Sequence, residues 1–203
     1  VDEISPYVIN AGRRYGWWRS ECAALSPLDA ASRRKGTLPG EGACAILLGA
    51  SDSASPCGGD GAVIAAVRTE PLPRPGISRV NASDEVDFLR NAVASGAGTL
   101  GEVDFLMLGA NGDASLDDVY RRVSESFSAA AGRNVPRGVY KHTCGEFCAA
   151  SGVGIALVAR AVCQKSALTD IELAGAAPEA PASNVVVYNL SRAGYHSACY
   201  IKG

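Results

Sequence analysis

The sequence predicts an α/β domain in which helices are layered against a sheet. Short apolar runs of strand length alternate with segments of helical spacing along most of the chain. Residues 147–161 are mostly small and apolar, which favours a helix packed closely against its neighbours inside a layered fold. The hydrophobic content of 47% in 203 residues is ample for the core of one large domain or two small ones.

The N-terminal part of the chain is expected to contribute little regular structure. Residues 1–35 have an irregular pattern, with Trp17 and Trp18 beside several arginines. These aromatic side chains would pack on a neighbouring segment or, alternatively, line a substrate tunnel or contact another subunit. Residues 43–48 form an apolar run without polar alternation, which predicts a strand covered on both faces. Residues 51–60 are loop-like in composition.

Strand-like and helix-like segments alternate between residue 61 and the end of the chain. The predicted strands are residues 61–69, 103–108, 184–190 and 197–202, and the predicted helices are residues 84–94, 116–131 and 147–161. The helix at 84–94 has Ser83 or Asp84 available as its N-cap. Residues 174–183 are rich in Ala and Pro and are expected to form a loop.

Two segments could carry chemistry on physical grounds. The turn at residues 110–113 follows a predicted strand, and sites in open α/β sheets lie at the carboxyl ends of strands. Lys141 and Glu146 come just before the small-residue helix, where an ammonium group can keep a carboxylate ionised and assist proton transfer. A structural ion pair that caps the helix is the alternative interpretation, and the residues alone favour it.

The composition argues against several classes of function. A net charge of −2 and a pI near 5.7 provide no basic surface for nucleic acid. No apolar run reaches the roughly 18 residues that a membrane span needs. The seven cysteines lack paired metal-ligand spacing, so we expect buried thiols in a reducing, cytoplasmic compartment, with no metal and no cofactor of the chain's own.

Four segments, read in order, resemble the β-ketoacyl synthases of the thiolase superfamily. They are LSPLDAASRRKGTLPGEGACAILL (25–48), VDFLMLGANGDASLDD (103–118), YKHTCGEFCAASGVGIALVARAV (140–162) and YNLSRAGYHSACYIK (188–202). The first is similar to a PFD-x-x-R-x-G stretch that runs into GEGAGALVLE, and the others to a HGTGTPLGD motif, a K-x-x-x-G-H motif and a GFGGTNA turn. A thiolase or an acyl-CoA synthase of the same superfamily fits less well, since the GEGA and K-x-x-x-G motifs favour the carrier-protein branch.

The resemblance implies a thiolase-like layered αβαβα fold of two similar halves, with residues 1–55 at the end of the first half and 56–203 forming the second. It also implies a decarboxylative Claisen condensation of acyl and malonyl thioesters, delivered on the phosphopantetheine of an acyl carrier protein. In that reaction a cysteine holds the acyl chain and two histidines stabilise developing negative charge. Family members pair, so a homodimer or heterodimer is expected.

The chain departs from the family pattern at the positions that carry the chemistry. None of its cysteines matches the nucleophile, which is expected upstream of Val1. Asn111 stands at the first histidine position and can still donate a hydrogen bond. Glu146 stands at the second, where an ionised carboxylate would repel an oxyanion unless burial keeps it protonated. Lys141 matches the family lysine, and His196 in the GFGGTNA-like turn either approaches the site or simply fills the turn.

Two functions are open on this basis. In the first, the chain is the larger part of a divergent condensing enzyme of fatty acid or polyketide-type biosynthesis, with Asn111, Lys141, Glu146 and His196 as its altered catalytic site. In the second, it is a non-catalytic partner that resembles a chain-length factor and shapes the tunnel of an active synthase. Both imply a complementary N-terminal half or a second ketosynthase-like subunit, because an isolated half would expose apolar surface.

Overall fold

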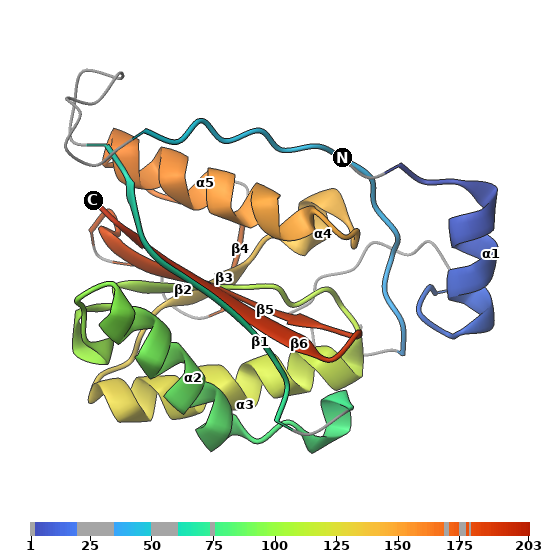
Figure 1. The fold of residues 1–203 in the computed structure, drawn as a ribbon, viewed down its shortest axis with the longest axis horizontal. Helices are drawn as coiled ribbons and strands as arrows, with labels where there is room; N and C mark the ends of the chain where they lie inside the picture. The colour runs from blue at the N-terminus through green and yellow to red at the C-terminus, as the bar shows by residue number, and fades with distance from the viewer. Residues whose placement is uncertain are drawn as a thin grey trace.

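The protein is built on one mixed β-sheet with helices on both faces (Figure 1). The computed structural model describes residues 3–19, 35–49, 61–73, 76–168, 171–174, 178 and 180–203. The strands in these ranges are β1 (Val63–Pro71), β2 (Phe105–Leu108), β3 (Arg137–Val139), β4 (Glu172–Ala174), β5 (Asn184–Ser191) and β6 (Tyr195–Lys202). They lie in the order β1-β6-β5-β2-β3-β4. The pairs β5–β2 and β2–β3 are parallel, and the other neighbouring pairs are antiparallel.

Two core regions separate the sheet from its helices. One face of the sheet carries α2 (Ala82–Ser95) and α3 (Ala114–Ala131), and the other carries α4 (Lys141–Cys144) and α5 (Ala150–Gln164). Two short 3-10 helices, η2 (Ile77–Arg79) and η3 (Leu100–Glu102), flank α2, while α1 (Pro6–Arg14) stands beside the layers. The described residues therefore form three layers, helix, sheet and helix, as the α/β layered prediction requires.

Strands β2 and β5 are central, and their sequences fit burial on both sides. All four residues of β2 are buried, so its apolar run needs no polar alternation. In β5, Val186 and Tyr188 belong to the core beneath α2 and α3, whereas Val185 and Val187 belong to the core beneath α5. Alternate residues of a strand point to opposite faces, which explains why one strand serves both cores.

The helices α2 and α3 begin at side-chain caps. Asn81 caps α2 by accepting a hydrogen bond from the Ser83 backbone N–H at 3.0 Å, so the expected cap at Ser83 or Asp84 was placed too late. Asp113 caps α3 by accepting from the Ser115 N–H at 3.0 Å. The helix consequently begins at residue 114 rather than 116, directly after the turn that follows β2.

Several expectations for the N-terminal part were wrong. Residues 43–48 form no strand: they find no strand partner among the described residues, and Leu47 is 93% exposed. The stretch 1–35 is not wholly irregular either, because Pro6–Arg14 is helical, with Ser5 as its N-cap and Pro6 in the first turn. Residues 20–34, and the loop predicted at residues 51–60, lie outside the described residues.

Two further expectations need correction. The small-residue helix α5 buries one side only, through Ala150, Gly154, Val158, Ala161 and Val162, so it is not enclosed by the described residues. The cysteines are not uniformly buried: Cys199 is buried, but Cys148 and Cys163 are exposed.

The short strands β3 and β4 were not predicted, since three residues show no periodicity. No helix within the described ranges is long and apolar enough to cross a membrane.

Gly109 joins β2 to the turn that follows, and it has no room for a side chain. A Cβ atom there would lie 2.0 Å from Asn189 Oδ1 and 2.8 Å from the Tyr120 hydroxyl. We predict that Gly109→Ala lowers the free energy of unfolding by roughly 1–3 kcal/mol in urea denaturation, because the packed strand end must shift. Gly101→Ala is the matched control, since its Cβ would meet nothing closer than 3.7 Å. Equal stability of the two variants would contradict this account.

Candidate functional site

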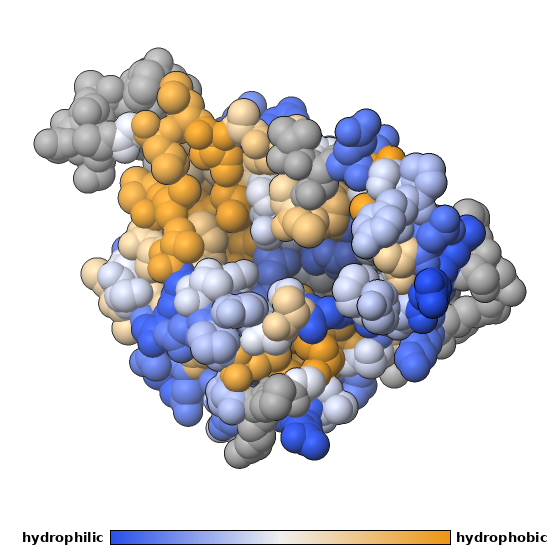
Figure 2. Space-filling model, turned by 45° about the vertical axis from the view of Figure 1, so that its right-hand side comes forward, coloured by the Kyte–Doolittle hydropathy of each residue, from blue (hydrophilic) through white to orange (hydrophobic). Residues whose placement is uncertain are grey.

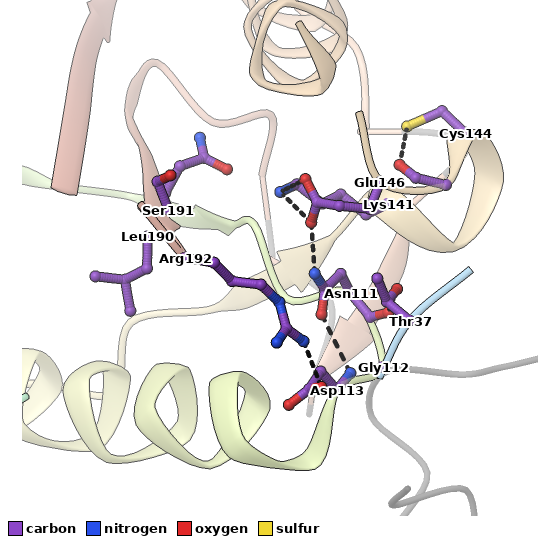
Figure 3. A network of polar contacts seen from close by, with 12 residues as sticks. Thr37, Asn111, Gly112, Asp113, Lys141, Cys144, Glu146, Leu190, Ser191 and Arg192 are labelled. Carbon is purple, nitrogen blue, oxygen red and sulfur yellow. Dashed lines mark hydrogen bonds and ion pairs between the residues drawn. The ribbon is translucent and has the colours of Figure 1, made fainter. Parts of the chain in front are cut away.

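The two segments singled out in the sequence meet at one edge of the sheet. Asn111 lies in the turn after β2, and Lys141 begins α4 directly after β3. Because β2 and β3 are parallel neighbours, their carboxyl ends lie side by side. Glu146 follows α4 and turns back toward both residues, so the three side chains come together (Figure 3).

Glu146 is the centre of this cluster. The Lys141 ammonium nitrogen donates to Glu146 Oε1 at 2.9 Å and to Oε2 at 2.8 Å. The Asn111 side-chain amide also donates to Glu146 Oε2. Lys141 and Asn111 are each only 6% exposed, whereas the Glu146 side chain is 24% exposed. The geometry is that of a carboxylate held by a buried cation and an amide.

The backbone of Glu146 is fastened to the glycine-rich segment before residue 43. The Glu146 N–H donates to the Leu38 carbonyl at 3.0 Å, and the Gly40 N–H donates to the Glu146 carbonyl at 3.0 Å. A Cβ on Gly40 would lie 1.9 Å from the Cys144 carbonyl oxygen, and Gly145 has φ +73°, so both positions require glycine. The sequence pattern identified this segment but not its contact with Glu146.

The orientation of the Asn111 amide is fixed by its neighbours. Its Oδ1 accepts from the Asp113 backbone N–H at 3.1 Å, which leaves the amide nitrogen as the group that faces Glu146. The Asn111 carbonyl accepts from the Thr37 hydroxyl. The Asn111 and Gly112 N–H groups donate to Asp117 Oδ1 at 3.0 and 3.3 Å. Hydrogen bonds to the Asn111 side chain, to its carbonyl and to its N–H group therefore fix the turn.

Asp113 ties this turn to two other parts of the chain. Its fully buried carboxylate accepts from the Gly36 N–H and from Ser115, and it forms an ion pair with Arg192 in the turn between β5 and β6. Burial alone would raise its pKa, but the Ser115 and Gly36 hydrogen bonds and the Arg192 charge together hold the pKa below its usual value. Arg19 adds a further tie by donating to the Gly112 carbonyl.

Asp117 is the most perturbed carboxyl group at the site. Its pKa is raised from 3.8 to about 7, chiefly by burial and in addition by the neighbouring Asp113 charge, and hydrogen bonds from the Asn111 and Gly112 N–H groups only partly oppose these effects. The charge of Arg19 also favours the ionised form. Asp117 therefore titrates near neutrality while it holds the backbone of the Asn111 turn.

The cysteine closest in sequence to this cluster is not activated. Burial raises the pKa of the Cys144 thiol, and the Glu146 charge raises it further, although Lys141 partly compensates. A nucleophilic cysteine needs a lowered pKa. Among the described residues, no three His, Cys, Asp or Glu side chains gather as a possible metal site.

His196 lies elsewhere in the protein. Its ring faces α2, where Nδ1 is 2.7 Å from Glu85 Oε2 and the ring stacks on Phe88 with a centroid distance of 3.7 Å. Glu85 also accepts from the Tyr188 hydroxyl at 2.6 Å. The structure brings together Asn111, Lys141 and Glu146, but not His196. A position in a strand fixes the face of the sheet, and a shift by one residue reverses it, so the motif alone could not decide.

No family model and no curated protein sequence matches the chain, but several solved structures match it. One is a type II polyketide synthase acyl-carrier protein in complex with its ketosynthase bound to the hexaketide (TM-score 0.80, 15% identity, 98% of this chain and 53% of that one).

A second is the ishigamide ketosynthase/chain length factor (TM-score 0.73, 19% identity, 99% of this chain and 52% of that one). A third is a ketosynthase from module 6 of the bacillaene synthase of Bacillus subtilis 168 (TM-score 0.76, 15% identity, 100% of this chain and 41% of that one).

The chain has the fold of the ketosynthases. It spans about half the length, or less, of the ketosynthase chains it matches. At 15–19% identity the likeness establishes the thiolase-like fold alone. The fold expected from the motifs is therefore confirmed, while the division at residues 55 and 56 and the catalytic roles of Asn111, Lys141, Glu146 and His196 stay predictions.

The raised pKa of Asp117 predicts a pH-dependent stability. A folded-state pKa near 7, above the unfolded value, means that the native protein binds this proton more tightly, so the stabilisation present at acidic pH is lost as pH rises to about 7. Asp117→Asn keeps the acceptor without the charge. Relative to the unsubstituted protein, we expect it to gain roughly 1–3 kcal/mol at pH 8 and much less at pH 4.5 in urea denaturation. An equal difference at both pH values would contradict the assignment.

Removal of the Arg192–Asp113 ion pair should destabilise the protein. Arg192→Met leaves the fully buried Asp113 carboxylate without its cation, and we expect a loss of roughly 1–3 kcal/mol in thermal or urea denaturation. Arg90→Met is the matched control, because the Arg90–Asp87 pair is 50% and 60% exposed and should change stability by no more than about 0.5 kcal/mol. Similar losses in both variants would show that Arg192 stabilises no buried charge.

Proposed function

We propose that the chain is a non-catalytic ketosynthase-like subunit, similar in role to a chain-length factor, in a condensing complex of polyketide or fatty acid type. The single observation that carries this proposal is the Glu146 carboxylate, which takes the hydrogen-bond donors of both Lys141 and Asn111. The kind of complex is inferred from the matched structures, which are a ketosynthase with its acyl-carrier protein and a ketosynthase/chain length factor.

The chemistry of condensation explains why this arrangement favours a non-catalytic role. Loss of carbon dioxide from a malonyl thioester leaves an enolate, whose negative oxygen must be stabilised by hydrogen-bond donors. An ionised carboxylate has acceptors only, so Glu146 cannot donate to that oxygen. It would repel the enolate at close range, and it already engages both the Lys141 ammonium group and the Asn111 amide.

The exposed apolar surface supports a partner subunit. Apart from Tyr195, the large exposed hydrophobic side chains of the described residues fall into two groups along the chain, Ile4, Tyr7, Val8, Tyr15 and Trp17 in the first and Ile46, Leu47, Leu48, Val63 and Val67 in the second. Figure 2 shows a broad hydrophobic area at the upper left of the face drawn there and a smaller one near its lower edge. Contiguous apolar surface marks a protein interface. We infer that a second ketosynthase-like subunit, or a complementary N-terminal half, covers it.

The complex that we propose works with an acyl carrier protein in the cytoplasm. One matched structure is a ketosynthase in complex with its acyl-carrier protein, and another is a ketosynthase/chain length factor. In such a heterodimer the active partner would hold the acyl chain on its cysteine. This chain would then shape the space that the growing acyl chain occupies.

A second candidate is a condensing enzyme whose nucleophilic cysteine lies outside these 203 residues. The convergence of Asn111, Lys141 and Glu146 at the carboxyl ends of β2 and β3 favours it, since that is where catalytic groups gather in α/β sheets. In this case Glu146 must leave the two donors during turnover, and Asn111 would bind the thioester oxygen.

The two candidates predict different effects of the same substitutions. In the complete natural complex, a non-catalytic role predicts that Lys141→Met and Glu146→Gln change the condensation rate by less than about threefold once folded protein is matched. A catalytic role predicts that Lys141→Met loses roughly 10²–10³-fold in rate, as for removal of an electrostatic donor. The rate is measured with acyl- and malonyl-carrier thioesters, and Arg90→Met serves as a surface control.

The position of the acyl group is a second readout of that experiment. After incubation with an acyl-carrier thioester, mass spectrometry should find the acyl adduct on the partner and on none of this chain's cysteines. An adduct on the polypeptide that contains this chain, together with the large rate losses, would establish the second candidate instead.

A further inference from the structure

The surroundings of Glu146 resemble those of a bound small carboxylate. Lys141 donates to both carboxylate oxygens, and Asn111 donates to one of them, from elements that follow two different strands. An ammonium group makes strong, charge-assisted hydrogen bonds to a carboxylate, and a side-chain amide N–H can add a further one. Figure 3 shows both donors pointing toward the same carboxylate group.

The Asn111 donor is positioned by contacts other than Glu146. Asp113 N–H and the Thr37 hydroxyl hold the Asn111 side chain and backbone, so its amide nitrogen keeps its direction when Glu146 is removed. The Lys141 backbone is fixed at the start of α4, where its carbonyl accepts from the Gly145 N–H at 2.8 Å, and the residue is only 6% exposed. The Asn111 amide is therefore preorganised, and the buried Lys141 ammonium group starts close to it, before any ligand enters.

The position is also reachable from the surface. Lys141 and Asn111 are almost fully buried, but 24% of the Glu146 side chain is exposed. A small ligand that replaces this side chain would therefore have a route from solvent to both donors.

We propose that Lys141 and Asn111 form a carboxylate-binding site that the chain fills with its own Glu146. The ligand class is a small carboxylate, such as acetate or one carboxyl group of malonate. This inference rests on the proposed function, in which Glu146 remains in the site permanently. It deepens that function by explaining why a free acid does not compete: a tethered group has an effective concentration far above that of a dissolved ligand.

Removal of Glu146 converts the filled site into an open one. The Lys141 ammonium group is then buried without the carboxylate that balances it, and the folded protein becomes less stable. A carboxylate that binds the folded form and not the unfolded form restores stability in proportion to its occupancy. The restoration should saturate and should require Lys141.

The test measures the melting temperature of Glu146→Ala in sodium acetate, sodium malonate and sodium chloride at equal ionic strength. Acetate or malonate should raise the melting temperature by about 5 °C over chloride, with saturation. The unsubstituted protein and the double variant Glu146→Ala/Lys141→Met should respond alike in all three salts. A single variant that does not distinguish carboxylate from chloride, or a double variant that responds equally, would overturn the proposal.

A second variant keeps the proposal open to refutation if Glu146→Ala does not fold in chloride. Glu146→Asp retains a charge but shortens the side chain by one methylene, so it should leave part of the site open and show a smaller, saturable response to acetate. Failure of Glu146→Ala to fold in acetate together with no response of Glu146→Asp would also overturn the proposal. An acyl adduct on this polypeptide would instead overturn the proposed function and leave the acetate response unaffected.

Discussion

The ion pair between Lys141 and Glu146, completed by the Asn111 amide, is the interaction on which the site depends. It links the ends of β2 and β3 to the segment around Gly40, because the Glu146 backbone is hydrogen-bonded to residues 38 and 40. A buried ion pair is costly to break since the remaining charge loses both water and partner. The cluster therefore fixes the chemistry of the site as well as its shape.

The residue type at position 146 decides what the proposed site can do. A neutral histidine donates a hydrogen bond through one ring nitrogen, whereas a carboxylate held by a lysine only accepts. Glu146 is an acceptor in the structure and engages Lys141 and Asn111 at the same time. In the function that we propose, the sheet and helices of the fold stay the same while this position prevents the stabilisation of an enolate.

Much of the fold could be predicted from the sequence because its central strands and long helices are strongly periodic. The strands β1, β2, β5 and β6 and the helices α2, α3 and α5 were found with end errors of a few residues. The strand predicted at residues 43–48 was wrong for a physical reason: an apolar run forms a buried strand only if a neighbouring strand is present to pair with it. Helix α1 carried a usable signal in Ser5 and Pro6, but its mixed composition concealed it.

The site was predicted in part. The strand-end turn and the lysine-to-glutamate segment each indicated chemistry, and the parallel pairing of β2 and β3 is what unites them. The contact between Glu146 and the Gly40 segment, and the ties of Asp113 to Gly36 and Arg192, join residues that are distant in sequence, so no local pattern reveals them. For His196 the motif was visible in the sequence, but its location was not predictable. The face of the sheet on which a strand residue lies depends on the register of the strand, and His196 lies against Glu85 instead of at the site.

The most direct test of the account is release of carbon dioxide from a malonyl-carrier thioester by the complete polypeptide that contains this chain, without its partner. A site whose two donors are held by Glu146 should give no release above the uncatalysed background, with the unsubstituted protein and Lys141→Met indistinguishable. Release that Lys141→Met or Asn111→Ala abolishes would contradict the account and show that the site stabilises an enolate after all.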